Sequence, residues 1–101
     1  MVELIPTSYA QSPEQFLELV QGIRNNYSTW RVTDMGGLSS RKGSLHFHIQ
    51  SMGPGENGTL EITFDPKFQG KIELKLATNR QGNYGNILRE KLITFIQQTN
   101  D

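Results

Sequence analysis

The chain of 101 residues contains no cysteine. It therefore has no disulfide bond, no thiolate metal site and no cysteine nucleophile. It also has no apolar run that approaches the roughly 20 residues of a membrane-spanning helix, so we expect no membrane association. The first residues lack the charged and apolar regions of a signal peptide, which favours a cytoplasmic protein.

An excess of charge of either sign is missing as well. Ten lysines and arginines are balanced by ten aspartates and glutamates. A dedicated nucleic-acid-binding protein usually carries a basic excess, because neutralisation of phosphates dominates its affinity. No motif in the chain is specific enough to indicate a family, and no arrangement of side chains predicts catalytic residues.

What the chain does contain is strict alternation of apolar and polar residues in three segments between Leu45 and Leu76. The apolar positions are Leu45, Phe47 and Ile49, then Leu60, Ile62 and Phe64, then Ile72, Leu74 and Leu76. A period of two places the apolar residues on one face of each strand and the polar residues on the other. The pattern predicts an antiparallel sheet with one buried face and one polar face.

Two helices and one further strand are predicted around these segments. Ser12 and Pro13 suit the cap and first position of a helix that ends near Asn25 and Asn26, and a second helix is predicted from Ile87 onward. Residues 28–35 form the first predicted strand, in which Trp30 is expected to cap the core. Residues 2–5 are at most a brief edge strand that ends at Pro6.

The predicted architecture is therefore α+β, in the order helix, four strands, helix. Sequential strands usually neighbour one another, so the four strands are expected to form an antiparallel meander with both helices packed on its apolar face. A length of 101 residues predicts a single domain over residues 1–101. Of the two expected sheet edges, the strand with Trp30 is favoured for self-association, since Lys71 and Lys75 discourage pairing on the other.

Matching the apolar residues across each hairpin also predicts the neighbours on the polar face. Pairing Phe47 with Ile62 places His48 opposite Glu61 and His46 opposite Thr63. Pairing Ile62 with Leu74 places Glu61 opposite Lys75, and Asp65 opposite Lys71. If Val32 lies beside Phe47, a row of side chains follows on the polar face: Arg31, His48, Glu61 and Lys75.

His46 and His48 are the residues of this face that a metal could use. They lie on the same face of one strand, about 7 Å apart along it, and Glu61 could supply a third ligand. Two cations, Arg31 and Lys75, are predicted to flank this group, which disfavours a divalent ion. We therefore expect no cofactor and a solvated sheet face.

The leading functional prediction is a small, non-catalytic binding or adaptor module that acts through protein contacts as a monomer or homodimer. One alternative is nucleic-acid binding through the polar face and the basic loop with Arg41 and Lys42. Another is a small metal-dependent enzyme centred on His46 and His48. Arg80, near the glycines at positions 82 and 85, is a further candidate for contact with an anion. The predicted binding residues are Arg31, His46, His48, Glu61, Lys75 and Arg80.

Overall fold

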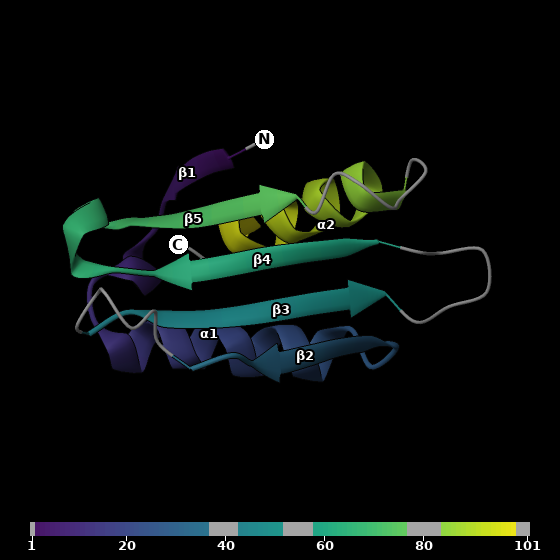
Figure 1. The fold of residues 1–101 in the computed structure, drawn as a ribbon, viewed down its shortest axis with the longest axis horizontal. Coiled ribbons are helices and arrows are strands. Elements are labelled where there is room, and N and C mark those ends of the chain that lie inside the picture. Colours follow the sequence, from purple (N-terminus) through teal and green to yellow (C-terminus); the bar gives the residue numbers. More distant parts are fainter. Residues whose placement is uncertain (1, 37–42, 52–57, 77–83, 99–101) are drawn as a thin grey trace.

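The computed structural model describes residues 2–36, 43–51, 58–76 and 84–98 (Figure 1). In chain order, the elements are β1 (Val2–Pro6), the 3-10 helix η1 (Ser8–Ala10), α1 (Pro13–Asn26), β2 (Trp30–Asp34), β3 (Leu45–Ser51), β4 (Thr59–Phe64), the 3-10 helix η2 (Pro66–Phe68), β5 (Lys71–Leu76) and α2 (Tyr84–Gln98). The α+β class is confirmed.

One antiparallel sheet contains all five strands in the order β1-β5-β4-β3-β2. Strands β2 to β5 neighbour one another in chain order, as predicted. The prediction of four strands is wrong, however, because β1 adds a fifth strand beside β5. The strand with Lys71 and Lys75 is therefore an interior strand of the sheet, and β1 and β2 form the edges.

Strand β1 includes Pro6, which was expected to end it. The backbone N–H of Thr7 donates to the carbonyl of Gly70 at 3.2 Å, so Ile5 and Glu3 are the next hydrogen-bonded positions toward the N-terminus. Pro6 falls between Thr7 and Ile5, at a position that makes no ladder bond, so its missing N–H removes no hydrogen bond from the sheet. Proline is therefore compatible with this edge strand.

A contact between distant segments holds β1 against α2. Glu3 faces the helices, and its Oε1 lies 2.6 Å from Nη2 of Arg89. Nε of Arg89 donates to the same oxygen at 2.7 Å. This hydrogen bond with Glu3 is the main reason that the pKa of the Arg89 guanidinium is raised. The ion pair joins residues from opposite ends of the chain, so no local pattern predicted it.

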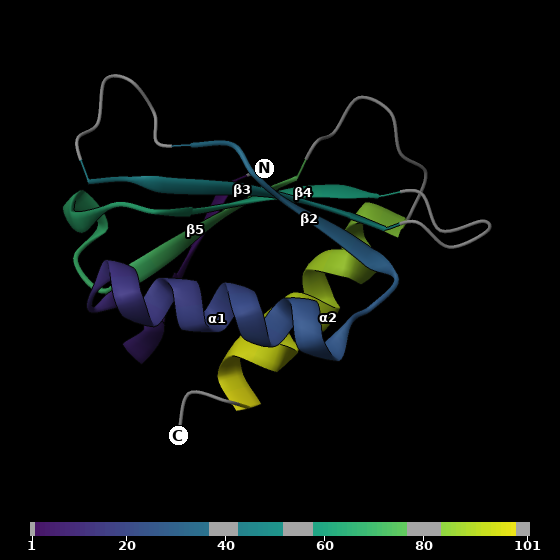
Figure 2. The ribbon, with the colours of Figure 1, turned by 90° about the horizontal axis from the view of Figure 1, so that it is seen from below.

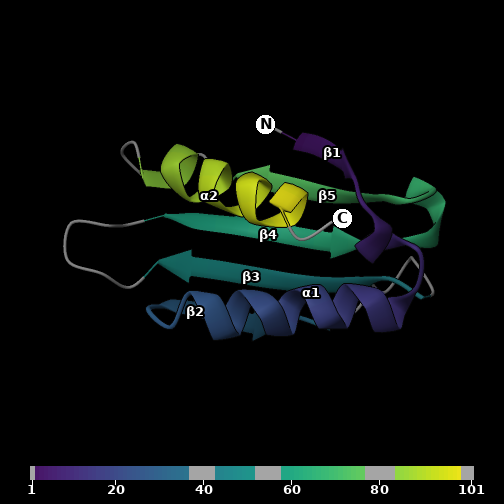
Figure 3. The ribbon, with the colours of Figure 1, turned by 180° about the vertical axis from the view of Figure 1, so that it is seen from behind.

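Both helices cover the same face of the sheet, as predicted (Figure 2). Seen from the helical side, α1 lies along β2 and β3, and α2 lies over β4 and β5 (Figure 3). The core forms between these two layers. Its fully buried side chains include Phe16, Leu19, Val20 and Ile23 from α1, Leu88, Leu92 and Ile96 from α2, and Ile49, Leu60, Ile62, Ile72 and Leu74 from the sheet. Each buried side chain of this kind contributes about 1.5–3 kcal/mol of hydrophobic stabilisation.

The start of α1 is as predicted. The Ser12 hydroxyl accepts a hydrogen bond from the Gln15 backbone N–H at 3.1 Å, and Pro13 occupies the first turn. Just after the helix, the Tyr27 ring stacks on Trp30 with a centroid distance of 3.9 Å. Trp30 is buried in the core, where the sequence placed it.

Helix α2 begins at Tyr84, three residues before the predicted start at Ile87. Gly85 precedes the predicted start, but it lies in the first turn of the helix and is buried. A Cβ atom on Gly58, which precedes β4, would lie 3.1 Å from the Gly85 nitrogen. Glycine at position 58 therefore permits a close approach of the two backbones, and the start of α2 is packed against β4 rather than left as a loop.

Candidate metal-binding site on the polar sheet face

The polar face is the sheet face opposite the two helices. The register between β3 and β4 and between β4 and β5 is as predicted. His46 lies opposite Thr63 and His48 opposite Glu61 between β3 and β4. Between β4 and β5, Glu61 lies opposite Lys75.

The predicted position of Arg31 is wrong by two residues. Val32 pairs with Ile49 rather than Phe47, so Arg31 lies opposite Gln50, and Thr33 is the neighbour of His48. A shift of two residues keeps every side chain on its predicted face, so the alternating pattern could not detect it. As a result, the row contains Thr33, His48, Glu61 and Lys75, and Arg31 does not join it.

Asp65 also departs from its predicted place opposite Lys71. Strand β4 ends at Phe64, and Asp65 caps the 3-10 helix η2 with a buried side chain. Its Oδ1 accepts a hydrogen bond from the Lys67 backbone N–H at 3.0 Å. The turn chemistry of Asp-Pro therefore removes this carboxylate from the polar face.

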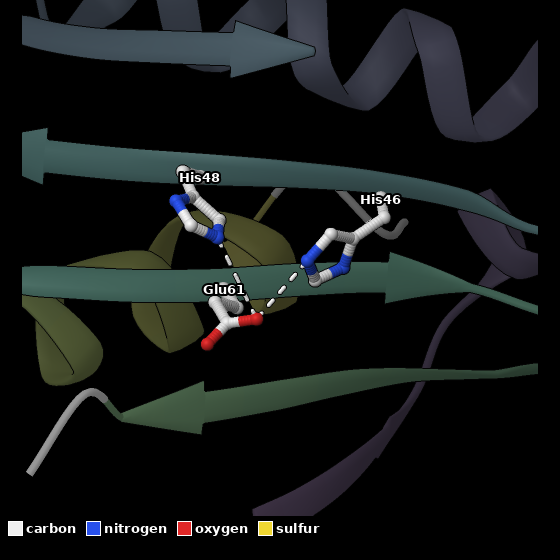
Figure 4. Close-up of side chains that lie close together, drawn as sticks. All are labelled: His46, His48 and Glu61. Atoms are coloured by element: carbon white, nitrogen blue, oxygen red, sulfur yellow. Dashed lines mark ion pairs between the residues drawn. The ribbon is translucent and has the colours of Figure 1, made fainter. Parts of the chain in front are cut away.

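His46, His48 and Glu61 converge at the centre of the polar face (Figure 4). Oε1 of Glu61 lies 3.0 Å from Nε2 of His46 and 3.6 Å from Nε2 of His48. The imidazole rings stand edge to face, with centroids 5.4 Å apart. The side chains of His46, Glu61 and His48 are 13%, 24% and 37% exposed, respectively, so solvent reaches the cluster from one side.

The other nitrogen of His46 is held by Thr63. Its Nδ1 lies 2.7 Å from Oγ1 of Thr63, a residue that is only 2% exposed although it belongs to the polar face. A hydroxyl can donate or accept, so this contact suits either tautomer of the ring. If a metal occupied Nε2, then Nδ1 would carry the proton and donate it to Thr63. A metal-ligating histidine generally donates its second N–H to an oxygen acceptor, and the Thr63 hydroxyl would be that acceptor here.

The distances fit a first-row transition ion. One ligand atom from each of His46, His48 and Glu61 lies within 4.8 Å of the other two. Ligands bound at about 2.0–2.2 Å in a tetrahedral zinc site lie roughly 3.3–3.6 Å from one another. The two measured nitrogen–oxygen distances, 3.0 and 3.6 Å, are close to this spacing.

Of the two cations that were predicted to flank the cluster and disfavour a metal, one is displaced and the other lies where it was predicted. Arg31 is displaced along β2, as described above. Lys75 lies opposite Glu61 in the ladder, and Oε1 of Glu61 contacts both imidazoles (Figure 4). The remaining predicted residue, Arg80, lies outside the described residues, as do Arg41, Lys42 and Gly82.

No family model, curated protein or solved structure matches this chain. None of the helices in the described ranges is long and apolar enough to cross a membrane.

Proposed function

We propose that this chain is a small binding domain that holds a divalent first-row transition ion, with zinc as the reference metal, on its polar sheet face. His46 and His48 supply imidazole nitrogens and Glu61 supplies a carboxylate oxygen. The observation that carries the proposal is the convergence of these three ligand atoms within 4.8 Å. Two histidines with one carboxylate are a known ligand set for zinc and for non-haem iron.

Three features of the surroundings support this proposal. The ligands lie on adjacent strands inside a five-stranded sheet, so the backbone fixes their separation. Thr63 orients the His46 ring from the side away from Glu61. The cluster is also partly shielded from water, which strengthens the interaction between a cation and the carboxylate.

Titration of the metal-free chain with zinc tests the proposal. We expect one zinc ion to bind per chain at neutral pH, measured by calorimetry. At free zinc of about 100 times the dissociation constant, the folded state gains about 2.7 kcal/mol. For a domain of this size that gain raises the melting temperature by roughly 10–20 °C. Magnesium is the control, because it prefers oxygen ligands in octahedral geometry and should give no comparable shift. An unchanged melting temperature in excess zinc, or an equal response to magnesium, contradicts the proposal.

Protein binding, the leading prediction from the sequence, is a second candidate. One observation favours protein binding at the β1 edge, whereas the sequence favoured the edge strand that contains Trp30. Val2 and Leu4 are exposed on β1, and their backbone groups point away from β5 because Glu3 and Ile5 make the ladder bonds. By contrast, at the β2 edge Nη2 of Arg24 donates to the Val32 carbonyl at 3.1 Å. The β1 edge is therefore the better place for a second copy to add a strand.

Sedimentation at high micromolar concentration tests this second candidate. We expect a concentration-dependent dimer that is lost when Leu4 is replaced by lysine, since a charge on an edge strand opposes pairing. Leu17→Lys is the control, because Leu17 is equally exposed but lies on α1. A monomer at every concentration rules out pairing of two copies at β1. The nucleic-acid alternative stays a prediction, since Arg41, Lys42 and Arg80 lie outside the described residues.

A further inference from the structure

The proposed metal would keep at least one coordination position for a ligand from elsewhere. Among the described residues, the group of potential ligands consists of His46, His48 and Glu61 only. Zinc takes four ligands in a tetrahedral site, and octahedral ions take six. A site with three protein ligands and an open position is the arrangement that binds water or an exogenous molecule rather than the closed arrangement of a structural metal.

The charge around this open position is positive. A divalent ion with two neutral imidazoles and one carboxylate carries one net positive charge. Lys75 adds a second, because it lies directly opposite Glu61 on β5 and is exposed. The Cβ atoms of residues directly opposite in an antiparallel pair are about 4.5–5.5 Å apart, so the lysine side chain is long enough to reach a molecule bound beside Glu61.

Two other charges on the polar face bear on this arrangement. Glu73 lies opposite Thr63, two residues from Lys75 on the same strand, and is the nearest competing carboxylate on β5. Arg31 lies opposite Gln50 on the far side of β3 and adds positive charge at a greater distance. Lys75 is therefore the cation best placed beside the ligand cluster. Among the described residues, the ion-pair contacts of Glu61 are with His46 and His48.

We propose that the open coordination position binds a small oxyanion, through a phosphate or carboxylate oxygen, and that Lys75 contacts a second oxygen of the same anion. This inference rests on the proposed metal site and names its ligand class. The metal offers a coordination position that an oxygen atom of the anion can occupy. The Lys75 ammonium group supplies a point charge with three hydrogen-bond donors, and lysine commonly binds phosphate in this way. An electrically neutral ligand would leave the ammonium without a partner at the site.

Cobalt provides a spectroscopic test, because the visible absorption of Co²⁺ responds to the ligands that it binds. The full chain is loaded with Co²⁺ and titrated with inorganic phosphate, and in a second arm with acetate. We expect a saturable change in the visible spectrum in at least one arm. Lys75→Met should weaken anion binding about tenfold, equivalent to about 1.4 kcal/mol, while the affinity for Co²⁺ stays within a few-fold of the native value.

Lys71→Met is the matched control. Lys71 is an exposed lysine on the same strand and the same face, but it lies opposite Pro6, about 13 Å along the strand from Lys75. Its replacement should leave anion binding unchanged. If cobalt binds but neither anion alters the spectrum, or if the two lysine variants behave alike, the oxyanion inference is wrong and the metal site stands. If cobalt does not bind at all, the proposed function and the inference both fail.

Discussion

Replacing Glu61 with glutamine is expected to weaken zinc binding more than about 100-fold and to remove the zinc-dependent rise in melting temperature. Loss of an outer contact to a ligand already costs 10–100-fold in affinity, and loss of an anionic ligand should cost more. Without metal, the same change should alter the free energy of unfolding by no more than about 1 kcal/mol, because the pairs of Glu61 with His46 and His48 are partly exposed. Calorimetry with zinc and thermal melts with and without metal measure both effects.

Glu73→Gln is the matched control for this variant. It removes the same charge from the same sheet face, but Glu73 lies on β5 opposite Thr63 and is not one of the three clustered residues. We expect Glu73→Gln to bind zinc with near-native affinity. Equal losses in the two variants would mean that zinc responds to the general charge of the polar face, and the specific site would then be wrong.

The candidate site could be located from the sequence because alternation specifies register strongly where one face is buried. His46, His48 and Glu61 were placed together by pairing Phe47 with Ile62, and this pairing is the one found. Alternation gives the face of each side chain, and the matched apolar residues give the offset between strands. The rotamers are not part of that pattern. The contact of Glu61 with both histidines could therefore be seen only in the structure.

Arg31 shows where the same argument fails. Strand β2 is short, and apart from Trp30 its only apolar side chain is Val32. The sequence alone therefore does not decide whether Val32 pairs with Ile49 or with Phe47. Val32 pairs with Ile49, and the alternative with Phe47 differs by two residues without exposing any apolar side chain. The error changed the interpretation of the site, because it placed a cation beside His48 that actually lies opposite Gln50.

Long-range contacts account for the other errors. Strand β1 is added to the sheet by pairing with β5, almost seventy residues later in the chain, and by the ion pair of Glu3 with Arg89. Thr63 was expected to be solvated, yet it is buried and bonded to His46. Both outcomes depend on what surrounds a residue in space. Local propensity and alternation carry no information about such neighbours.

The apolar core on the helical face of β4 holds the backbone of the candidate site in place. Ile62 lies on β4, the central strand of the sheet, on the face opposite Glu61 and Thr63. It is paired with Phe47 on one side and Leu74 on the other. The strand that carries Glu61 is therefore fixed by burial of its other face.

Replacing Ile62 with alanine should lower the free energy of unfolding by about 2–5 kcal/mol, because the lost burial is combined with a cavity that the surrounding sheet and helices cannot fill. Ile87→Ala is the control, since Ile87 is 45% exposed on α2 whereas Ile62 is 0% exposed. Its replacement should change stability by less than about 0.5 kcal/mol, because surface substitutions have small effects and alanine favours helix. Urea denaturation of the metal-free chain measures both values. Similar losses for the two isoleucines would contradict the described packing of β4, and with it the backbone that positions Glu61 between the histidines.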